Sequence, residues 1–459
     1  MESFWIQIYS HIEMGEQLET TRKSKNTKSM RMNEEFMEKS DFEFVKKRSL
    51  EIFKFNQYEE GDIFYHLPSL GSYGQQFAWD SGWSVIGAAN IIPENALKEL
   101  QTVYKLQLES GRISHEIVIK KGGNSFSRMM LAPLIAGMFD ENNKSYFLDP
   151  PAYLCAAEVL YNRTKDKRVF DLLPAMEACV TYLLEKRDLF GDGLISVVHP
   201  WETGCDNAPY FDEPMDITIN KPFWKAKYLL KYLKIIRKLR KINWKLDIVK
   251  EKNMFAMEDV GVNGLTAAGM ISISNLFKEA GNAEKSEEYF LKAEKLVKSI
   301  EKHLWVESKG FFYPRIDFKN PKNLLRSTAI GISPLLTGLV EKDKAISVLE
   351  NYLDSDEHFK SPYGVSFNSR SELEEGISFD TDFLWRGPCI WMNINWIAAK
   401  AADIFERRDI SKEITKKTVK LLEKSGFREF YHPETGIGGG AKNFTWGTVV
   451  LDMIRDYLN

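Results

Sequence analysis

The chain has 459 residues, of which 44% are hydrophobic, and its formal net charge is -3. A chain of this length buries a large core and accommodates two or three domains, although single-domain barrels reach the same size. Lys and Arg number 62 against 65 Asp and Glu, so no overall electrostatic attraction to nucleic acid follows. The apolar runs are too short to span a bilayer, and we therefore expect no membrane partner.

The cysteines and histidines indicate neither disulfides nor a metal site. The cysteines show no CxxC spacing, and no cluster of His, Cys and Asp has metal-ligand spacing. We therefore expect reduced thiols in a cytoplasmic protein. The residues after Met1 lack a basic region leading into an apolar run, which argues against a signal peptide. The four cysteines are Cys155, Cys179, Cys205 and Cys389.

Residues 1–33 are expected to form a flexible N-terminal extension. Residues 20–32 (TTRKSKNTKSMRM) are polar and basic and have no apolar periodicity. From residue 34 to residue 459 the pattern is helical almost throughout, which predicts one folded domain. The clearest helical patterns, with apolar residues at i, i+3 and i+4, cover residues 42–55, 96–108, 152–161, 170–186, 264–278, 284–304 and 390–405.

Two architectures fit a series of about a dozen helices without a well-kept repeat. One is an (α/α)6 barrel, in which paired helices close into a toroid, and the other is an irregular α-solenoid. Residues 79–92 and 390–405 are apolar or small on most faces, as expected of helices that are buried on all sides. Because an inner ring buries its helices in this way, we predict an all-α fold of the (α/α)6 barrel type, a six-hairpin toroid.

The first segment with chemical potential is QQFAWDSGW, at residues 75–83. Asp80 stands between Trp79 and Trp83 at a helix start. Sugars present hydroxyls to carboxylates and a C–H face to aromatic rings, so the segment fits a sugar-binding carboxylate with a tryptophan platform. A helix-capping Asp among core aromatics fits the same residues.

The second segment follows the turn GDG at residues 191–193 and contains HPWETGCDN. Glu202 and Asp206 lie four residues apart, next to Trp201, in a loop rich in Gly, Pro and aromatic residues. A third carboxylate, Glu429, lies far downstream in the loop EFYHPETG. Two carboxylates on separate loops, backed by tryptophans, are what acid/base cleavage of a sugar linkage needs. The alternative is that Glu202 and Asp206 are solvated loop residues or helix caps.

Two further segments are rich in aromatic residues. LWRGPCIWMNINW, at residues 384–396, combines Trp385 and Arg386 with Asn393, which fits an aromatic cleft with an amide donor and an Arg fork for oxygen ligands. Core tryptophans with capping amides are the alternative. The Glu429 loop ends in GIGGG and resumes at Trp446. The glycine run lacks the preceding strand and the following Lys-Ser/Thr of a phosphate loop.

Residues 225–250 form a strongly basic segment. Leu229, Leu230, Leu233 and Ile236 fit one helix face. The basic residues are then expected on the solvated outer face of a helix, in preference to a site for an anionic partner.

In this order, the four chemical segments resemble the glycoside hydrolase clan that includes family 63, with the family 37 trehalases as distant kin. The nearest likeness is to the compact mannosylglycerate and glucosylglycerate hydrolases, and it covers roughly residues 45–458. GDGL…HPWETGCDN is similar to the family's HPWESG-x-DNSP loop, and WRGPCIWMNINW to its YWRGP-x-W-x-N-x-NW helix start. EFYHPETG…NFTW is similar to the loop that holds the family's second carboxylate.

The resemblance implies an (α/α)6 barrel that hydrolyses α-glycosidic bonds with inversion and needs no cofactor. The general acid falls on Asp206 and the general base on Glu429, with room for a water between carboxyls about 6.5–9.5 Å apart. Glu202 then holds a substrate hydroxyl or orients its loop. The substrate-binding residues implied by the segments and the resemblance together are Trp79, Asp80, Trp201, Glu202, Trp385, Arg386, Asn393 and Trp446.

Three residues depart from the family pattern. Asp149 stands where the family has Gln, Tyr210 where many members have Arg, and Leu384 where the family has Tyr. The first two changes add an anion and remove a cation, so they disfavour a carboxylate aglycone, although Lys221 and the basic helix are candidates to restore the charge.

The predicted function is inverting hydrolysis of an α-linked disaccharide or small glycoside, glucosyl or mannosyl. The predicted partner is a small carbohydrate, and the sequence leaves the oligomeric state open. Two alternatives remain: a non-hydrolytic (α/α)6 carbohydrate enzyme, such as an isomerase or phosphorylase, and a non-catalytic helical scaffold.

Overall fold

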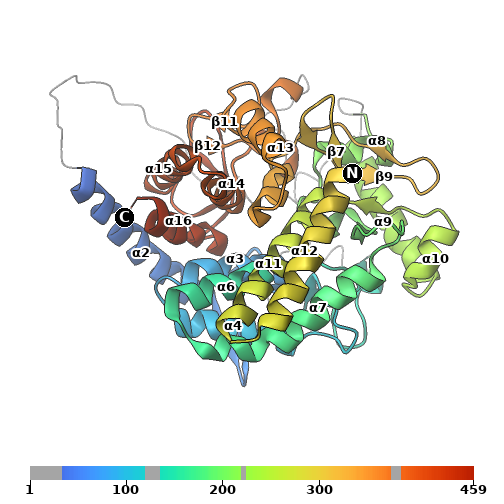
Figure 1. Cartoon of the computed structure of the whole chain (residues 1–459), viewed down its shortest axis with the longest axis horizontal. Helices are drawn as coiled ribbons and strands as arrows, with labels where there is room; N and C mark the ends of the chain where they lie inside the picture. The colour runs from blue at the N-terminus through green and yellow to red at the C-terminus, as the bar shows by residue number, and fades with distance from the viewer. Residues whose placement is uncertain (1–33, 119–134, 219–223, 374–383, 459) are drawn as a thin grey trace.

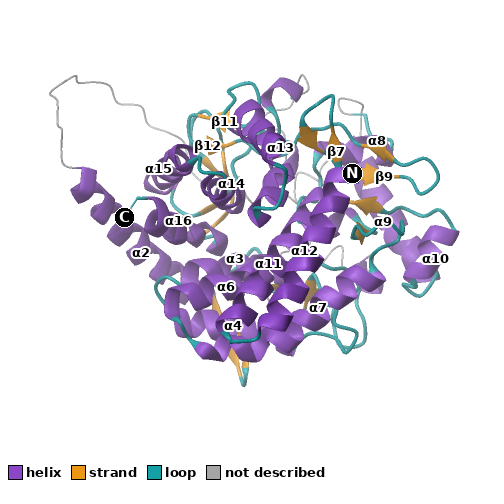
Figure 2. Cartoon of the chain, in the orientation of Figure 1, coloured by secondary structure: helices purple, strands orange, loops and turns teal. Residues whose placement is uncertain are grey.

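The computed structural model describes residues 34–118, 135–218, 224–373 and 384–458. Helices dominate these residues, and short strands lie in the connections between them (Figure 2). The helices are α2 (Glu34–Asn56), α3 (Ala78–Ala88), α4 (Pro93–Lys105), α6 (Ala152–Thr164), α7 (Leu173–Lys186), α8 (Asp212–Met215), α9 (Trp224–Lys241), α10 (Leu246–Glu251), α11 (Val260–Glu279), α12 (Ala283–His303), α13 (Lys342–Ser347), α14 (Met392–Ile404), α15 (Arg408–Ser425) and α16 (Val450–Tyr457).

The strands are short and form small antiparallel sheets. The largest sheet has four strands in the order β10-β9-β6-β5, and the others have two. The strands are β1 (Gln57–Glu60), β2 (Ile63–His66), β3 (Gln76–Phe77), β4 (Glu116–Ile117), β5 (Ser196–Val197), β6 (Met257–Glu258), β7 (Trp305–Val306), β8 (Phe311–Phe312), β9 (Arg315–Ile316), β10 (Lys322–Asn323), β11 (Lys360–Ser361), β12 (Gly364–Val365), β13 (Arg428–Tyr431) and β14 (Gly438–Lys442).

Helical segments of the described residues pack into a closed inner ring. Around the ring, α3 packs on α6, α6 on α11, α11 on the 3-10 segment η5 (Ala329–Thr337), and η5 on α14. Next, α14 packs on the 3-10 turn η9 (Thr445–Val449), which precedes α16, and η9 returns to α3. Helices α4, α12 and α15 pack outside α3, α11 and α14 (Figure 1). This closure confirms the (α/α)6 barrel and excludes the open solenoid.

The ring closes because its helices carry small residues where they meet. Every residue of α3 is buried. A Cβ on Gly82 would lie 2.6 Å from the backbone nitrogen of Tyr153 on α6, and one on Gly87 would lie 2.0 Å from the hydroxyl oxygen of Thr448 in η9. Any larger residue at either position would push α3 away from one of its neighbours. This close packing explains why the sequence of α3 is apolar or small on most faces, which is the pattern that predicted an inner helix.

Most helix boundaries differ from the sequence prediction by a few residues, and α2 begins eight residues earlier than predicted. Two further differences have a clear physical cause. The predicted helix 170–186 begins with a 3-10 turn (Lys167–Leu172), and α7 starts beside Pro174, which fits only a first helical turn. The basic segment 225–250 divides into α9 and α10, because Asn243 and Trp244 both adopt positive φ, 50° and 58°. The predicted extension, residues 1–33, lies outside the described residues.

Helix α11 corrects the expectation that no apolar segment is long enough for a membrane span. Among the described residues it is the one helix with sufficient length and hydropathy. Its most apolar window is 89% buried inside the fold, where it packs against α6, α12 and η5. Such burial is what an inner barrel helix requires, so this feature is weak evidence for a membrane.

Candidate active site

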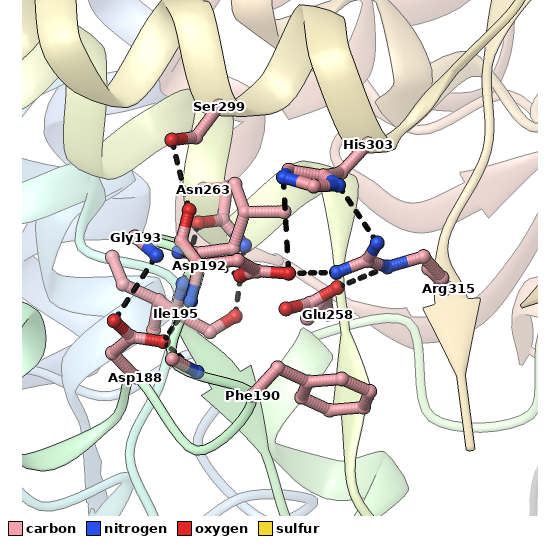
Figure 3. A network of polar contacts seen from close by, with 12 residues as sticks. Asp188, Phe190, Asp192, Gly193, Ile195, Glu258, Asn263, Ser299, His303 and Arg315 are labelled. Atoms are coloured by element: carbon pink, nitrogen blue, oxygen red, sulfur yellow. Dashed lines mark hydrogen bonds and ion pairs between the residues drawn. The ribbon is translucent and has the colours of Figure 1, made fainter. Parts of the chain in front are cut away.

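The loop that carries the candidate acid is anchored by the turn that precedes it. The carboxylate of Asp188 accepts hydrogen bonds of 2.7–3.1 Å from the backbone N–H groups of residues 191–193. Arg315 on β9 donates to Asp192 in this turn and, over 2.6 Å, to Glu258 on β6 (Figure 3). Burial raises the pKa of Glu258 to about 8 in spite of this arginine. The network ties the turn to the four-stranded sheet that leads into the acid loop.

Glu202 lies inside this loop and is completely engaged by the protein. It is 0% exposed and forms a bidentate ion pair with Arg187, with nitrogen–oxygen distances of 2.8 and 2.9 Å. Its two carboxylate oxygens also accept from the backbone N–H of Leu148 at 3.0 Å and of Val198 at 2.6 Å. Both oxygens are therefore occupied, and the structure favours the loop-orienting role of Glu202 over contact with a substrate hydroxyl.

Asp206 lies on the same loop, close to the tryptophan of the first segment. Gly204 adopts φ 67° and packs so tightly that a Cβ there would lie 3.1 Å from the Trp79 indole. Tyr232 on α9 donates its hydroxyl hydrogen to the backbone carbonyl of Asp206. Burial, followed by the charge of Glu429, raises the pKa of Asp206 to about 7. The Asp206 carboxyl therefore holds its proton through the acidic range and is poised to release it near neutrality.

Glu429 lies on β13 in the β13–β14 hairpin. Its Oε1 accepts from the Tyr73 hydroxyl at 2.8 Å, its Oε2 from the backbone N–H of Ala441 at 2.8 Å, and its backbone carbonyl from the Trp446 indole at 3.3 Å. Gly440 has φ 63°, and a Cβ there would lie 2.5 Å from Oε2. Burial raises the pKa of Glu429, and the two donors to its carboxylate counteract that effect.

Asp80 interacts with Glu429 and Asp206 as a third carboxyl of the site. It is 9% exposed, and its Oδ1 has no hydrogen-bond partner among the described residues. Burial, followed by the charge of Glu429 and, more weakly, of Asp206, raises the pKa of Asp80. The indole Nε1 of Trp79 is another buried polar atom without a partner in the described chain. Buried polar atoms are rarely left unpaired, so these two atoms are candidates to contact a bound ligand.

Asp149 adds a fourth carboxyl and caps α3 from outside the helix. The helix begins after Phe77, which supplies no side-chain cap. Instead, Asp149 Oδ2 accepts from the backbone N–H of Trp79 at 3.0 Å, and its Oδ1 lies 3.8 Å from His115 Nε2. Asp149 is 2% exposed, and burial raises its pKa, with a smaller contribution from the charge of Asp80. It therefore positions the helix turn that presents Trp79 and Asp80.

The tryptophans of the third and fourth segments form one cluster beside Glu429. Trp385 and Trp391 stack with ring centroids 3.6 Å apart, and Trp446 packs edge-on against both. Arg386 is 0% exposed and forms a two-pronged ion pair with Asp212. Its fork is therefore engaged by the protein, and its role is to join this segment to α8.

The two remaining predicted site residues differ in exposure. Trp201 is partly exposed and packs against His199 and Tyr232, which places it beside the tyrosine that contacts the Asp206 backbone. Asn393 is 0% exposed at the start of α14, and its amide nitrogen has no partner among the described residues. No group of His, Cys, Asp and Glu in the described residues could hold a metal ion.

The comparison with known proteins identifies the family. The model of the mannosylglycerate hydrolase MGH1-like glycoside hydrolase domain matches residues 73–447. The chain belongs to this glycoside hydrolase family. Asp206, Glu429 and Asp80 all lie within the matched residues.

Relatives and solved structures agree with this assignment. The mannosylglycerate hydrolase of Thermus thermophilus is 24% identical over 84% of this chain and 95% of its own length. The glucosylglycerate hydrolase of Mycolicibacterium hassiacum is 22% identical over 83% of this chain and 92% of its length. A crystal structure of the Thermus thermophilus family 63 enzyme with Tris and D-glycerate has a TM-score of 0.75, covers 90% of this chain and all of its own, and is 22% identical.

The protein is thus a glycoside hydrolase. The prediction of a hydrolase is confirmed, and the alternative of a non-catalytic scaffold is excluded. Sequence reasoning did not assign site roles to the glycosidase residues that hold the carboxylates, namely Arg187, Tyr73, Tyr232 and Gly440. Each acts through a contact that has no local sequence signal. The hydrogen bond from Tyr73 to Glu429, for example, joins residues 356 apart.

The glycosidase should show a bell-shaped dependence of kcat/KM on pH. The rate should fall above about pH 7 as Asp206 loses its proton, and on the acid side as Glu429, whose pKa is raised by burial, becomes protonated. Because the two carboxyls interact, the two apparent pKa values belong to the pair. Initial rates across the acid and alkaline range, with a stability check at each pH, measure the profile. A rate that keeps rising through alkaline pH would contradict the acid assignment.

Proposed function

We propose that Asp206 is the general acid and Glu429 the general base of this glycosidase. The observation that carries the proposal is the unequal hydrogen bonding of two buried, interacting carboxyls. Glu429 receives two donors, from Tyr73 and Ala441, which favour its ionised form. The negative charge of Glu429 in turn helps to keep the proton on Asp206. When their environments push the pKa values of two carboxyls apart in this way, the one with the higher pKa serves as the acid and the other as the base.

The reaction then follows from this proton distribution. Asp206 gives its proton to the glycosidic oxygen as the bond from that oxygen to the anomeric carbon breaks. Glu429 takes a proton from a water that attacks the anomeric carbon from the opposite face, and the free sugar appears with inverted configuration. The proton gained by Glu429 returns to Asp206 through solvent, so one water is consumed in each cycle. Asp80 and Trp79 bind the hydroxyls of the sugar that is released.

The proposed substrates are α-mannosides and α-glucosides with a small aglycone. The relatives named above act on mannosylglycerate and glucosylglycerate, which supports glycerate or a compound of similar size. Asp80 and Asp149, however, lie beside the catalytic pair, and burial raises the pKa of both, so neither offers a positive partner to a carboxylate aglycone. Tyr210 is 1% exposed and supplies no positive charge. We therefore propose that a neutral aglycone, such as glycerol or a second sugar, serves at least as well as glycerate.

A comparison of glycosyl-glycerate with glycosyl-glycerol tests this specificity. We expect kcat/KM for the glycerol compound to equal or exceed that for the acid. Asp149→Asn keeps an acceptor for the Trp79 N–H and cannot ionise. Because burial raises the pKa of Asp149, this variant should shift the ratio toward the acid as the pH rises and Asp149 of the wild type ionises. An unpaired like-charge contact costs about 1–3 kcal/mol, roughly ten- to a hundredfold.

Two outcomes decide against this proposal. A strong preference of the wild-type enzyme for the acid, abolished by Lys221→Met, would mean that a cation outside the described residues supplies the charge. Release of no sugar from any α-mannoside or α-glucoside would overturn the substrate class itself. Location in the cytoplasm is a further proposal, supported by four cysteines that are all unpaired and buried.

A further inference from the structure

A second hollow lies on the outer side of the barrel and contains none of the candidate active-site residues. It has a volume of 380 Å³, within the range of small-molecule sites. It lies between α8, α9, the segment before β6 and the β9–β10 hairpin, which share one side of the molecule (Figure 1). It uses the basic segment for which the glycosidase reaction has no role.

The floor and walls of this hollow are apolar. Met215, Ile235 and Leu324 form a buried floor, at 3%, 8% and 2% exposure. Phe255 and Phe318 line the hollow and are only partly buried. Two partly exposed phenyl rings offer contact to a flat or apolar body.

The rim is basic, and part of its charge is uncommitted. Lys231, Lys234 and Lys238 lie three and four residues apart on α9 and therefore share one helix face. Lys231 lies 3.8 Å from Asp216. Lys234 and Lys238 are exposed and form no ion pair within the described part of the chain.

The acidic residues of the hollow are already engaged. Glu213 forms an ion pair with Lys322, the fourth lysine of the rim. The carboxylate of Asp317 accepts from the backbone N–H groups of Lys319 at 2.9 Å and Asn320 at 3.4 Å, and so closes its own turn. Lys234 and Lys238 thus form no ion pair in the described residues, although the carboxylate of Asp317, held by backbone N–H groups, lines the same hollow.

We propose that this hollow binds a phosphate monoester with a flat aromatic body, of the nucleoside monophosphate type. Two lysines at i and i+4 have Cβ atoms about 5–6 Å apart, so both ammonium groups reach one phosphate. Lysine binds phosphate as a compact point charge on a flexible stem. The phosphate lies at Lys234 and Lys238, and the aromatic body packs over the floor against Phe255 and Phe318.

Calorimetric titration of the full-length protein with AMP tests the proposal. We expect saturable binding that weakens as salt is added. The double variant Lys234→Gln/Lys238→Gln should weaken it by at least about tenfold, because both charge-assisted contacts are lost. Lys241→Gln removes the same charge from the end of the same helix, outside the hollow, and should leave the affinity unchanged. Asp206→Asn should also leave it unchanged, which separates this site from the active site.

Two fragments of AMP and one variant of the hollow complete the experiment. Adenosine lacks the phosphate and ribose 5-phosphate lacks the aromatic body, and each should bind at least about tenfold more weakly than AMP. Phe318→Leu should weaken AMP binding without affecting ribose 5-phosphate. The proposal is overturned if wild-type protein binds no AMP at millimolar concentration, or if the double lysine variant binds it as tightly. If adenosine bound as tightly as AMP, the proposed phosphate contact would be wrong. If ribose 5-phosphate bound as tightly as AMP, the proposed contact with an aromatic body would be wrong.

Discussion

Replacement of Asp206 by Asn should lower kcat/KM on a glycoside with an alkyl or sugar leaving group by about 10²–10⁴-fold, the usual contribution of a general acid. The substitution keeps the size of the side chain and removes the proton that the leaving oxygen needs. A 4-nitrophenyl glycoside leaves as a weakly basic phenolate and needs little protonation. The same variant should therefore lose much less activity on that substrate, and steady-state rates on the two substrates measure the difference.

The stability of Asp206→Asn separates a catalytic acid from a structural residue. The folded protein holds the Asp206 proton up to about pH 7, whereas the ordinary value for an aspartate is 3.8. The wild-type protein therefore loses stability as pH rises between these values, and the neutral amide does not. The variant should melt a few degrees above wild type at mildly alkaline pH and at the same temperature near pH 4. A variant that melts lower at both pH values would indicate a structural role.

The inner ring could be predicted from sequence because its signal is local. α3 and α14 are apolar or small on most faces, and this pattern favours burial on all sides whatever the helix packs against. The two-residue strands of the four-stranded sheet carry no comparable signal, since two residues are too few for a period-two pattern. The division of the basic segment at Asn243 and Trp244 could not be predicted either, because a tryptophan rarely adopts positive φ.

The local sequence predicts the candidate carboxylates, whereas the roles assigned to them followed only from the family resemblance. Glu202 and Asp206 have the same local context, a loop rich in Gly and aromatic residues, yet one is engaged in a buried ion pair with Arg187 and the other keeps a proton. The difference arises from partners that the fold brings together across the chain. Asp149 illustrates the same limit: the sequence indicates a charge near the cleft, whereas its capping of α3 over 3.0 Å appears only in three dimensions.

The four carboxyls of the site form one electrostatic unit. Burial raises the pKa of each, and Asp80 and Asp206 are raised further by the charge of Glu429. Ionisation of any one carboxyl therefore hinders ionisation of the next. Glu429 is the member with two hydrogen-bond donors to its carboxylate, so it is the group most able to remain ionised while Asp206 holds a proton. In the proposed mechanism, the division of roles between acid and base thus rests on the Tyr73 hydroxyl and the Ala441 backbone N–H.

Loss of the base should be reversible by a small anion. Glu429→Ala should lower kcat/KM by about 10²–10⁴-fold, because no group then takes the proton from the attacking water. Azide needs no deprotonation, and it fits the space that the carboxylate vacates. It should therefore attack the anomeric carbon while Asp206 protonates the leaving oxygen, restore turnover and give a glycosyl azide of inverted configuration. NMR of the product identifies its anomer. Asp206→Asn should gain nothing from azide on the alkyl glycoside, since the missing proton is on the other side of the bond. Rescue of Asp206→Asn but not of Glu429→Ala would reverse the assignment of acid and base. A glycosyl azide with retained configuration would refute the inverting mechanism.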